Sequence, residues 1–249
     1  MGVSVDYYTR LQQGRARSIS NEVLNAVARA LRLDRDERIH LHNLARLATV
    51  RKRPDRPQRV GAEMYQTLQA LSDVPAYVVG RRLDVLAWNE PAHLLVADFA
   101  TLPAAVRNMA RLVFLDDAAK GLYPDWESKA RDTVSNVRFD AGRHPDDPRL
   151  ASLVGELSLG SDDLRRLWAD HNVRGRTRGR KQFAHPLIGE LTLDYVAMRA
   201  PDDPDMTMMI YSASAGSDAD ASLRLLLSLA GQPGPIQHST GLAATTQTE

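Results

Sequence analysis

Cysteine is absent from this chain of 249 residues. Without cysteine there can be no disulfide-stapled fold, no zinc site built from thiolates and no cysteine nucleophile. Long apolar runs are missing as well, because the longest, around residues 223–230, is too short to cross a bilayer and contains Arg224. The N-terminus also lacks the apolar segment of a secretory signal. These absences predict a cytoplasmic protein that has no membrane partner.

Sequence motifs of catalysis are missing too. The chain has no G-x-S-x-G elbow, Walker A loop, G-x-G-x-x-G fingerprint or H-E-x-x-H zinc motif. His40 and His42 lie two positions apart in a predicted helix, so they point to different faces and are poorly placed to share a metal. Three Asp-Asp pairs lie beside turn residues, where acidic side chains are usually solvated: 116–117, 146–147 and 202–203. The sequence therefore predicts no enzyme, no metal site and no cofactor.

Lysine is scarce, and the charge is unevenly distributed. Only 4 of the 32 basic residues are lysine. Residues 1–60 carry 13 Arg or Lys against 6 Asp or Glu, a balance of +7, whereas residues 61–249 carry 19 against 25, a balance of −6. A small basic end joined to a larger acidic body indicates that only the first 60 residues face a polyanion.

The first 50 residues predict three short helices separated by turns. Ser4, Ser20 and Asp34 are each typical of a helix N-cap, and Gly14 ends the first helix. The second predicted helix carries one apolar stripe at helical spacing: Val23, Leu24, Val27, Ala28 and Leu31. The predicted domains are a helical segment at 1–50, a basic proline-containing linker at 51–60, a second domain at 61–231 and a disordered tail at 232–249.

The segment from Gly2 to Arg15 resembles the turn and recognition helix of the phage-repressor-like helix-turn-helix class. Five of its residues would face the major groove of double-stranded DNA: Ser4, Val5, Asp6, Thr9 and Arg10. Arg15 and Arg17, just after the helix, would contact phosphates. Two further helices precede this turn in that class, whereas this chain begins at the turn, so the predicted DNA-binding domain is partial. An ordinary surface helix with a basic end is the alternative interpretation.

Beyond the linker, the hydrophobic pattern alternates between helices and strands. Helices are predicted at residues 62–72, 90–113, from Pro124 onward, 148–157, 162–171 and after Ser217. Strands are predicted at residues 76–79, 83–88, 181–187, 190–199 and 206–214. This order predicts an α+β fold, an antiparallel five-stranded sheet with helices packed on one face and a cavity between the layers.

A series of short motifs resembles the ligand-binding domain of the MmyB-like transcription regulators. The motifs run in order through the second domain: DVLAWN from Asp84, RN from Arg107, RLVFLD from Arg111, LYPDWE from Leu122, LVGEL from Leu153, LW from Leu167, HP from His185 and GELTL from Gly189. The resemblance covers residues 62–230. It implies a PAS-like fold, a helix-turn-helix in front of it and a fatty-acid-like ligand in the cavity.

Aromatic and basic residues of these motifs are the candidate ligand contacts. The predicted acyl tunnel consists of Trp88, Phe114, Trp126, Trp168 and the methionines 206, 208 and 209. Asn89 belongs to the same candidate site, and three residues are the predicted donors to a carboxylate head group: Arg107, Asn108 and Arg111. Plain core packing is the alternative for the tryptophans, and a solvated helix face is the alternative for the two arginines.

The sequence therefore predicts a bacterial transcription regulator that binds double-stranded DNA and senses a fatty-acid-like molecule. A homodimer is expected, since most helix-turn-helix operators are symmetric. The alternative hypothesis is a lipid or small-molecule sensor or carrier without DNA binding, because the helix-turn-helix is truncated. The basic run at residues 174–181 is interpreted as an edge strand protected by charge.

Overall fold

The computed structural model describes residues 21–34, 37–38, 41–42, 58–170, 177–200, 203–229 and 237–238. The chain divides into two compact units, a helical unit of residues 1–56 with 134–175 and a sheet unit of residues 57–133 with 176–249. The division after Arg56 falls inside the predicted linker, whereas residues 134–175 were expected in the second domain. All seven predicted DNA contacts, from Ser4 to Arg17, lie outside the described residues.

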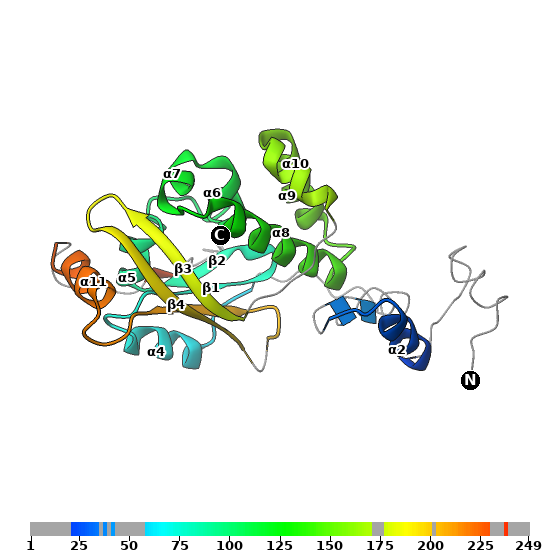
Figure 1. Cartoon of the computed structure of the whole chain (residues 1–249), viewed down its shortest axis with the longest axis horizontal. Coiled ribbons are helices and arrows are strands. Elements are labelled where there is room, and N and C mark those ends of the chain that lie inside the picture. Colours follow the sequence, from blue (N-terminus) through cyan, green and yellow to red (C-terminus); the bar gives the residue numbers. More distant parts are fainter. Residues whose placement is uncertain are drawn as a thin grey trace, which may run out of the picture. The chain divides into compact units, whose positions relative to one another are not determined.

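The sheet unit is built on an antiparallel sheet with the strand order β3-β4-β5-β1-β2-β6 (Figure 1). Its strands are β1 (Ala76–Val79), β2 (Val85–Trp88), β3 (Arg178–His185), β4 (Gly189–Arg199), β5 (Thr207–Ser212) and β6 (Gln237–His238). The five predicted strands are all present. The sixth corrects the expectation of a wholly disordered tail, since its two residues pair with the edge of β2, where backbone groups are open to pairing. As expected, β3 is the opposite edge strand.

Helices surround this sheet on both faces. They are α4 (Ala62–Ala70), α5 (Glu90–Leu95), α6 (Met109–Leu115), α7 (Asp117–Leu122), the start of α8 (Trp126–Arg143) and α11 (Asp218–Leu229), with a 3₁₀ turn η1 (Arg81–Leu83) between β1 and β2. The prediction of one helical region over residues 90–113 is wrong, because turns separate α5 from α6. Two features explain the break: the Asp98 carboxylate accepts from the Thr101 amide at 3.2 Å, and Pro103 has no amide to donate.

Alternate residues of the strands face two different cores. The inner face carries large side chains, among them Tyr77, Phe183, Leu193 and Tyr211, and packs against α5, α6, α7 and α11. The outer face carries Ala76, Val78, Ala87, Met206 and Met208, and packs against Leu68 of α4. Figure 1 shows α4 on the side of the sheet opposite α6 and α7. The α+β prediction is confirmed, but helices pack on both faces and not on one, because α4, predicted at residues 62–72, covers the outer face.

The two cores correct one detail of the predicted tunnel. Met206 and Met208 pack in the outer core under α4, so they cannot line a cavity on the inner face. Met209, one residue further along β5, packs against the inner core. The reason is the period of two in a strand, which sends neighbouring side chains to opposite faces.

The helical unit consists of α2 (Asn21–Ala30), the rest of α8, α9 (Pro148–Gly160) and α10 (Asp162–Ala169), among the residues the structure describes. The predicted helices after Ser20, at 148–157 and at 162–171 are confirmed. Asp147 caps α9 by accepting from the Arg149 and Leu150 amides, and Ser161 caps α10. Over the described part of the chain, every helix is too short or too polar to cross a membrane.

Candidate functional site

A cavity of about 750 Å³ lies on the inner side of the sheet unit. Its walls come from α5, α6, α7 and the hairpin between β3 and β4, and its lining is mostly aliphatic: Leu94, Leu95, Val96, Met109, Leu112, Val113, Ala119 and Leu122. Small-molecule sites usually measure about 300–1,000 Å³ and have apolar walls with few polar groups. The cavity therefore has the size and surface of a site for an apolar molecule.

Five polar side chains interrupt this lining: His93, Asp98, Asp116, Tyr123 and His185. His93 Nδ1 lies 3.4 Å from Asp98 Oδ1. Asp116 caps α7 by accepting from the Ala118 amide at 2.9 Å. The His185 ring bridges two backbone groups, the Leu94 carbonyl at 3.0 Å and the Leu187 amide at 3.3 Å, so its Nε2 carries the proton. Both side chains are committed to the protein. The Tyr123 hydroxyl is different, because it is buried in the wall and has no hydrogen-bond partner among the described residues.

Tyr123 also belongs to a layer of aromatic rings on the inner face. Neighbouring rings in this layer lie 5.4–6.2 Å apart, and its members are Tyr77, Trp88, Phe99, Tyr123, Phe183, Tyr195 and Tyr211. Burial raises the pKa of Tyr77, Tyr123 and Tyr211 above the ordinary value, and nearby tyrosines raise it further. These hydroxyls are therefore neutral hydrogen-bonding groups at physiological pH.

Two lysines and one aspartate lie at the α8 side of the aromatic layer. Lys181 of β3 forms an ion pair with Asp132 of α8 at 3.1 Å. Lys129, one turn earlier on α8, is 9% exposed, and its Nζ lies 5.1 Å from the ring centroid of Tyr123. Burial and the nearby Lys181 lower the pKa of Lys129, Asp132 raises it, and the net pKa is about 8. The cluster thus holds two cations and one carboxylate.

Of the residues predicted from the sequence, Trp88 and Asn89 end β2 and begin α5. Trp88 is buried in the inner core against Phe99. The Asn89 amide accepts from the amides of Ala76 and Ala92 and donates to the carbonyls of Leu71 and Val74. These four bonds use both donors and both acceptor positions of the side chain, so Asn89 is bound to the protein itself.

The predicted head-group donors have three different environments. Asn108 caps α6, and Arg111, half-exposed, donates to the Ala105 carbonyl at 2.9 Å. Arg107 is 8% exposed, and its guanidinium lies 4.6 Å above the Trp88 ring. Nη2 of Arg107 donates to the Leu102 carbonyl at 2.7 Å, but Nε and Nη1 have no acceptor among the described residues. Burial lowers the pKa of Arg107. None of the three lines the 750 Å³ cavity.

The remaining predicted aromatics fall into two groups. Phe114 and Trp126 contact each other edge to face, with centroids 5.9 Å apart, and the Trp126 indole donates to the Val113 carbonyl at 3.1 Å. Trp168 belongs to the helical unit, where the Arg138 guanidinium lies over its ring at 4.8 Å. The structure thus brings Trp88 and Arg107 together and pairs Phe114 with Trp126, while Trp168 lies in the other unit.

Sequence reasoning missed Tyr123 and Lys129. Tyr123 lies within the LYPDWE motif, and Lys129 is one of only 4 lysines in the chain. No clear signal in the sequence marked Lys129, because its neighbours one helical turn further on, Asp132 and Thr133, are polar. A metal is not indicated in the described residues, since no three His, Asp or Glu side chains there are placed to hold one.

A second cavity of about 530 Å³ has a different character. It lies beside the start of α11, and its walls carry Arg180, Glu190, Asp194 and Asp218. Arg180 already pairs with Asp194 at 3.2 Å. An apolar ligand is therefore better matched to the 750 Å³ cavity.

Comparison with protein families gives one match. The model of the MmyB-like transcription regulator ligand binding domain matches residues 60–226. The matched range includes all residues that line the 750 Å³ cavity and the Lys129 cluster. None of the curated proteins matches the chain.

Proposed function

The chain belongs to the MmyB-like transcription regulators, and from this premise we propose that its sheet unit senses a fatty-acid-like molecule while its N-terminal residues bind double-stranded DNA. The observation that carries the sensing function is the 750 Å³ cavity with its aliphatic walls. An acyl chain gains roughly 0.8 kcal/mol per buried methylene. The chain of dodecanoate thus contributes about 8 kcal/mol before the entropic cost of association, so one polar contact suffices for micromolar affinity.

The proposed DNA contacts are those predicted from the sequence. The balance of +7 over residues 1–60 supports this assignment, because phosphate neutralisation dominates the affinity of proteins for DNA. A homodimer would present two such segments to a symmetric operator. In this proposal the cavity regulates DNA binding and catalyses nothing.

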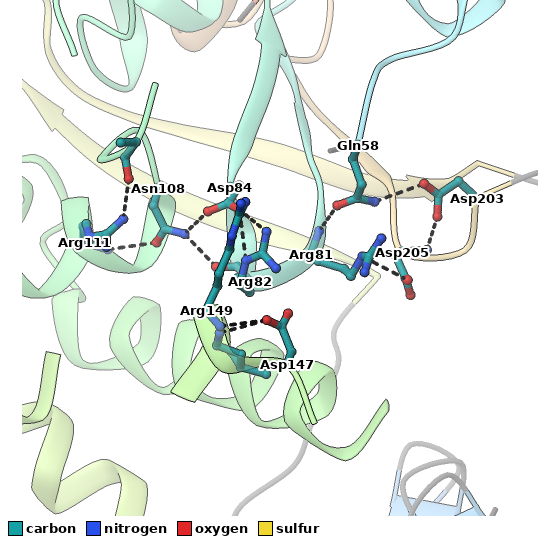
Figure 2. Close-up of polar contacts among 12 residues, drawn as sticks. Gln58, Arg81, Arg82, Asp84, Asn108, Arg111, Asp147, Arg149, Asp203 and Asp205 are labelled. Atoms are coloured by element: carbon teal, nitrogen blue, oxygen red, sulfur yellow. Dashed lines mark hydrogen bonds and ion pairs between the residues drawn. The ribbon is translucent and has the colours of Figure 1, made fainter. Parts of the chain in front are cut away.

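A chain of hydrogen bonds connects the cavity wall to the end of the linker (Figure 2). Helix α6, which supplies Met109 and Leu112 to the wall, is capped by Asn108. The Asn108 amide donates to the Arg82 carbonyl at 2.7 Å and to Asp84 Oδ1 at 2.8 Å, both in the turn between β1 and β2. A shift of α6 on ligand binding would therefore displace this turn as well.

The same turn holds Gln58, the first described residue of the linker. The Arg81 amide donates to Gln58 Oε1 at 2.6 Å, and Gln58 Nε2 donates to Asp203 at 3.0 Å (Figure 2). Gly80 permits this approach, because a Cβ there would lie 2.8 Å from Leu86 Cδ1 and closer still to the Gln58 side chain. Gln58 is thus the point at which the turn between β1 and β2 could act on the linker and on the DNA-binding residues before it.

The test combines ligand and DNA binding by the purified full chain. Native mass spectrometry followed by denaturing extraction is expected to show one fatty acid per subunit. Selection from a randomised duplex library, with and without added dodecanoate, is expected to enrich a symmetric sequence in only one of the two conditions. Ligand binding without DNA enrichment in either condition would favour a sensor or carrier instead. An empty cavity that also rejects dodecanoate would overturn the sensing function.

The connection through Gln58 can be tested separately. In Gly80→Ala the new methyl group displaces the Gln58 side chain, so dodecanoate should bind as in wild type while its effect on DNA affinity falls at least threefold. Gly155→Ala is the matched control, because a Cβ at Gly155 meets nothing within 4 Å. Equal effects of dodecanoate on DNA affinity in both variants would show that Gln58 does not transmit the signal.

A further inference from the structure

We propose that Lys129 and the Tyr123 hydroxyl form a receptor for an anionic head group at the cavity wall, so that the sensor selects apolar monoanions over neutral molecules with the same chain. The inference rests on the proposed sensing function and names the chemistry that the cavity selects. Neither residue was a candidate in the sequence.

The first observation is an uncompensated charge. Lys129 and Lys181 face one carboxylate, Asp132, and Asp132 is paired with Lys181. In the part of the chain that the structure describes, Lys129 forms no ion pair, and its Nζ lies 5.1 Å from the centroid of the Tyr123 ring. A buried cation is expensive unless a counter-ion accompanies it. A ligand carboxylate would supply that counter-ion.

The second observation is that Tyr123 belongs both to the cavity lining and to the surroundings of Lys129. Tyr123 is one of the residues that line the apolar cavity, and its ring centroid lies 5.1 Å from Lys129 Nζ. The residue is 2% exposed, and its hydroxyl has no hydrogen-bond partner among the described residues. A neutral phenol is a good donor to a carboxylate oxygen, and the flexible stem of lysine allows its ammonium to reach a second oxygen. Together they offer two charge-assisted hydrogen bonds where the aliphatic lining ends.

Arg107 is the rival receptor, since it is also buried with unpartnered donors. Its guanidinium lies on Trp88, which is outside the cavity lining, and one of its nitrogens is held by the Leu102 carbonyl. Lys129, in contrast, contacts a residue of the wall itself. The geometry therefore favours Lys129 as the head-group contact.

The proposal has a pH signature in wild type. A bound carboxylate stabilises the charged form of Lys129, whose pKa is about 8 without ligand. The groups that face it are Asp132 on α8, Lys181 on β3 and Tyr123 before α8, with Tyr195 and Tyr211 in the layer beyond. Dodecanoate affinity should be constant between pH 6 and 7 and fall above pH 8, by up to tenfold per pH unit.

The decisive experiment compares dodecanoate with 1-dodecanol, which share a chain and differ in charge. Calorimetric titration of the full chain at pH 7 should show that wild type prefers dodecanoate. Lys129→Met should weaken dodecanoate about tenfold or more and leave 1-dodecanol within twofold, since a hydrogen bond to a charged group contributes about 1.5–3 kcal/mol, and 1.4 kcal/mol is tenfold. Tyr123→Phe should weaken dodecanoate a few-fold. Lys120→Met is the matched control, because Lys120 is exposed and does not line the cavity.

Each other outcome has a distinct meaning. If neither probe binds wild type, the proposed sensing function itself fails. If both bind and Lys129→Met keeps the preference for dodecanoate while Arg107→Met loses it, the head group lies at Arg107 and the present inference is overturned. A dodecanoate affinity that does not change between pH 7 and 9 in wild type would overturn it without any variant.

Discussion

The two faces of the sheet are built from neighbouring residues of the same strands, yet they bury different chemistry. In β1, Ala76 and Val78 point to the outer core, where the buried residues are all apolar and Leu68 of α4 is completely enclosed. Tyr77 and Val79 point to the inner core, beside aromatic rings. The outer face is filled by small aliphatic and methionine side chains, whereas the inner face has an adjoining cavity and polar atoms without partners.

This difference separates stability from function. A core that is apolar and closely filled stabilises the fold and has nothing to offer a ligand. Buried polar groups without partners are unfavourable for folding, so we expect a bound molecule to complete the Tyr123 hydroxyl beside the cavity. This separation of the two faces would be wrong if a variant on the outer face changed ligand affinity as well as stability.

The largest effect is expected on the outer face. Leu68→Ala should destabilise the protein by about 3 kcal/mol, because Leu68 is 0% exposed and its truncation leaves a cavity between α4 and the sheet. Dodecanoate affinity of the folded fraction should stay within twofold of wild type. Urea denaturation and calorimetric titration measure the two quantities. Leu159→Ala, at a residue 89% exposed, is the control and should change stability by less than about 0.5 kcal/mol.

A change in dodecanoate affinity greater than fivefold in Leu68→Ala would contradict the separation of the two faces. It would mean that α4 and the outer core determine the shape of the cavity on the other side of the sheet.

A smaller effect is expected where the sheet meets α5. Asn89→Ala should destabilise the protein by about 2 kcal/mol, because it removes the cap of α5 and leaves the Ala76 amide and the Leu71 and Val74 carbonyls without their side-chain partner. Gln66→Ala, on the exposed side of α4, is a matched amide deletion and should be nearly neutral. Equal melting temperatures of the two variants would show that the four bonds of Asn89 contribute nothing net.

Much of this fold could be predicted from residue patterns. The β1 boundaries were predicted correctly, and so was the last helix, whose Ser217 cap accepts from the Asp220 amide at 3.2 Å. These predictions succeeded because a short apolar run that ends at a turn, and a helix cap, are local properties of the sequence. The break between α5 and α6 was missed, because most residues in 90–113 are compatible with a helix. Only one proline and one Asx turn interrupt the helix there.

The candidate site could be predicted only in part. The sequence placed Trp88 and Arg107 in one site, and they do contact each other. The assignment of Met206 and Met208 to the inner face failed because β5 is buried on both sides there, so burial alone does not reveal the direction of a side chain. The Lys129 cluster was missed because Lys181 is far from Lys129 in sequence and meets it only through the packing of α8 on β3.

The smallest expected effect on stability has the opposite sign and depends on pH. The pKa of Lys129 is about 8 in the folded protein, below its ordinary value of 10.5. Between these two values the unfolded chain binds more protons than the folded one, so wild-type stability rises with pH across that window. The full shift corresponds to roughly 3 kcal/mol at pH 7. Lys129→Met should be more stable than wild type by about 1–2 kcal/mol at that pH, because the variant also loses the cation–π contact with Tyr123.

Urea denaturation of ligand-free protein at pH 7 and at pH 10 checks this prediction. The difference in the free energy of unfolding between Lys129→Met and wild type should shrink as the pH rises above 8, because Lys129 in folded wild type then loses its proton and its charge. Lys120→Met should follow wild type at both values. A destabilised Lys129→Met would mean that the lysine already has a counter-charge inside the protein. The inner face, like the outer one, would then need no ligand to complete it.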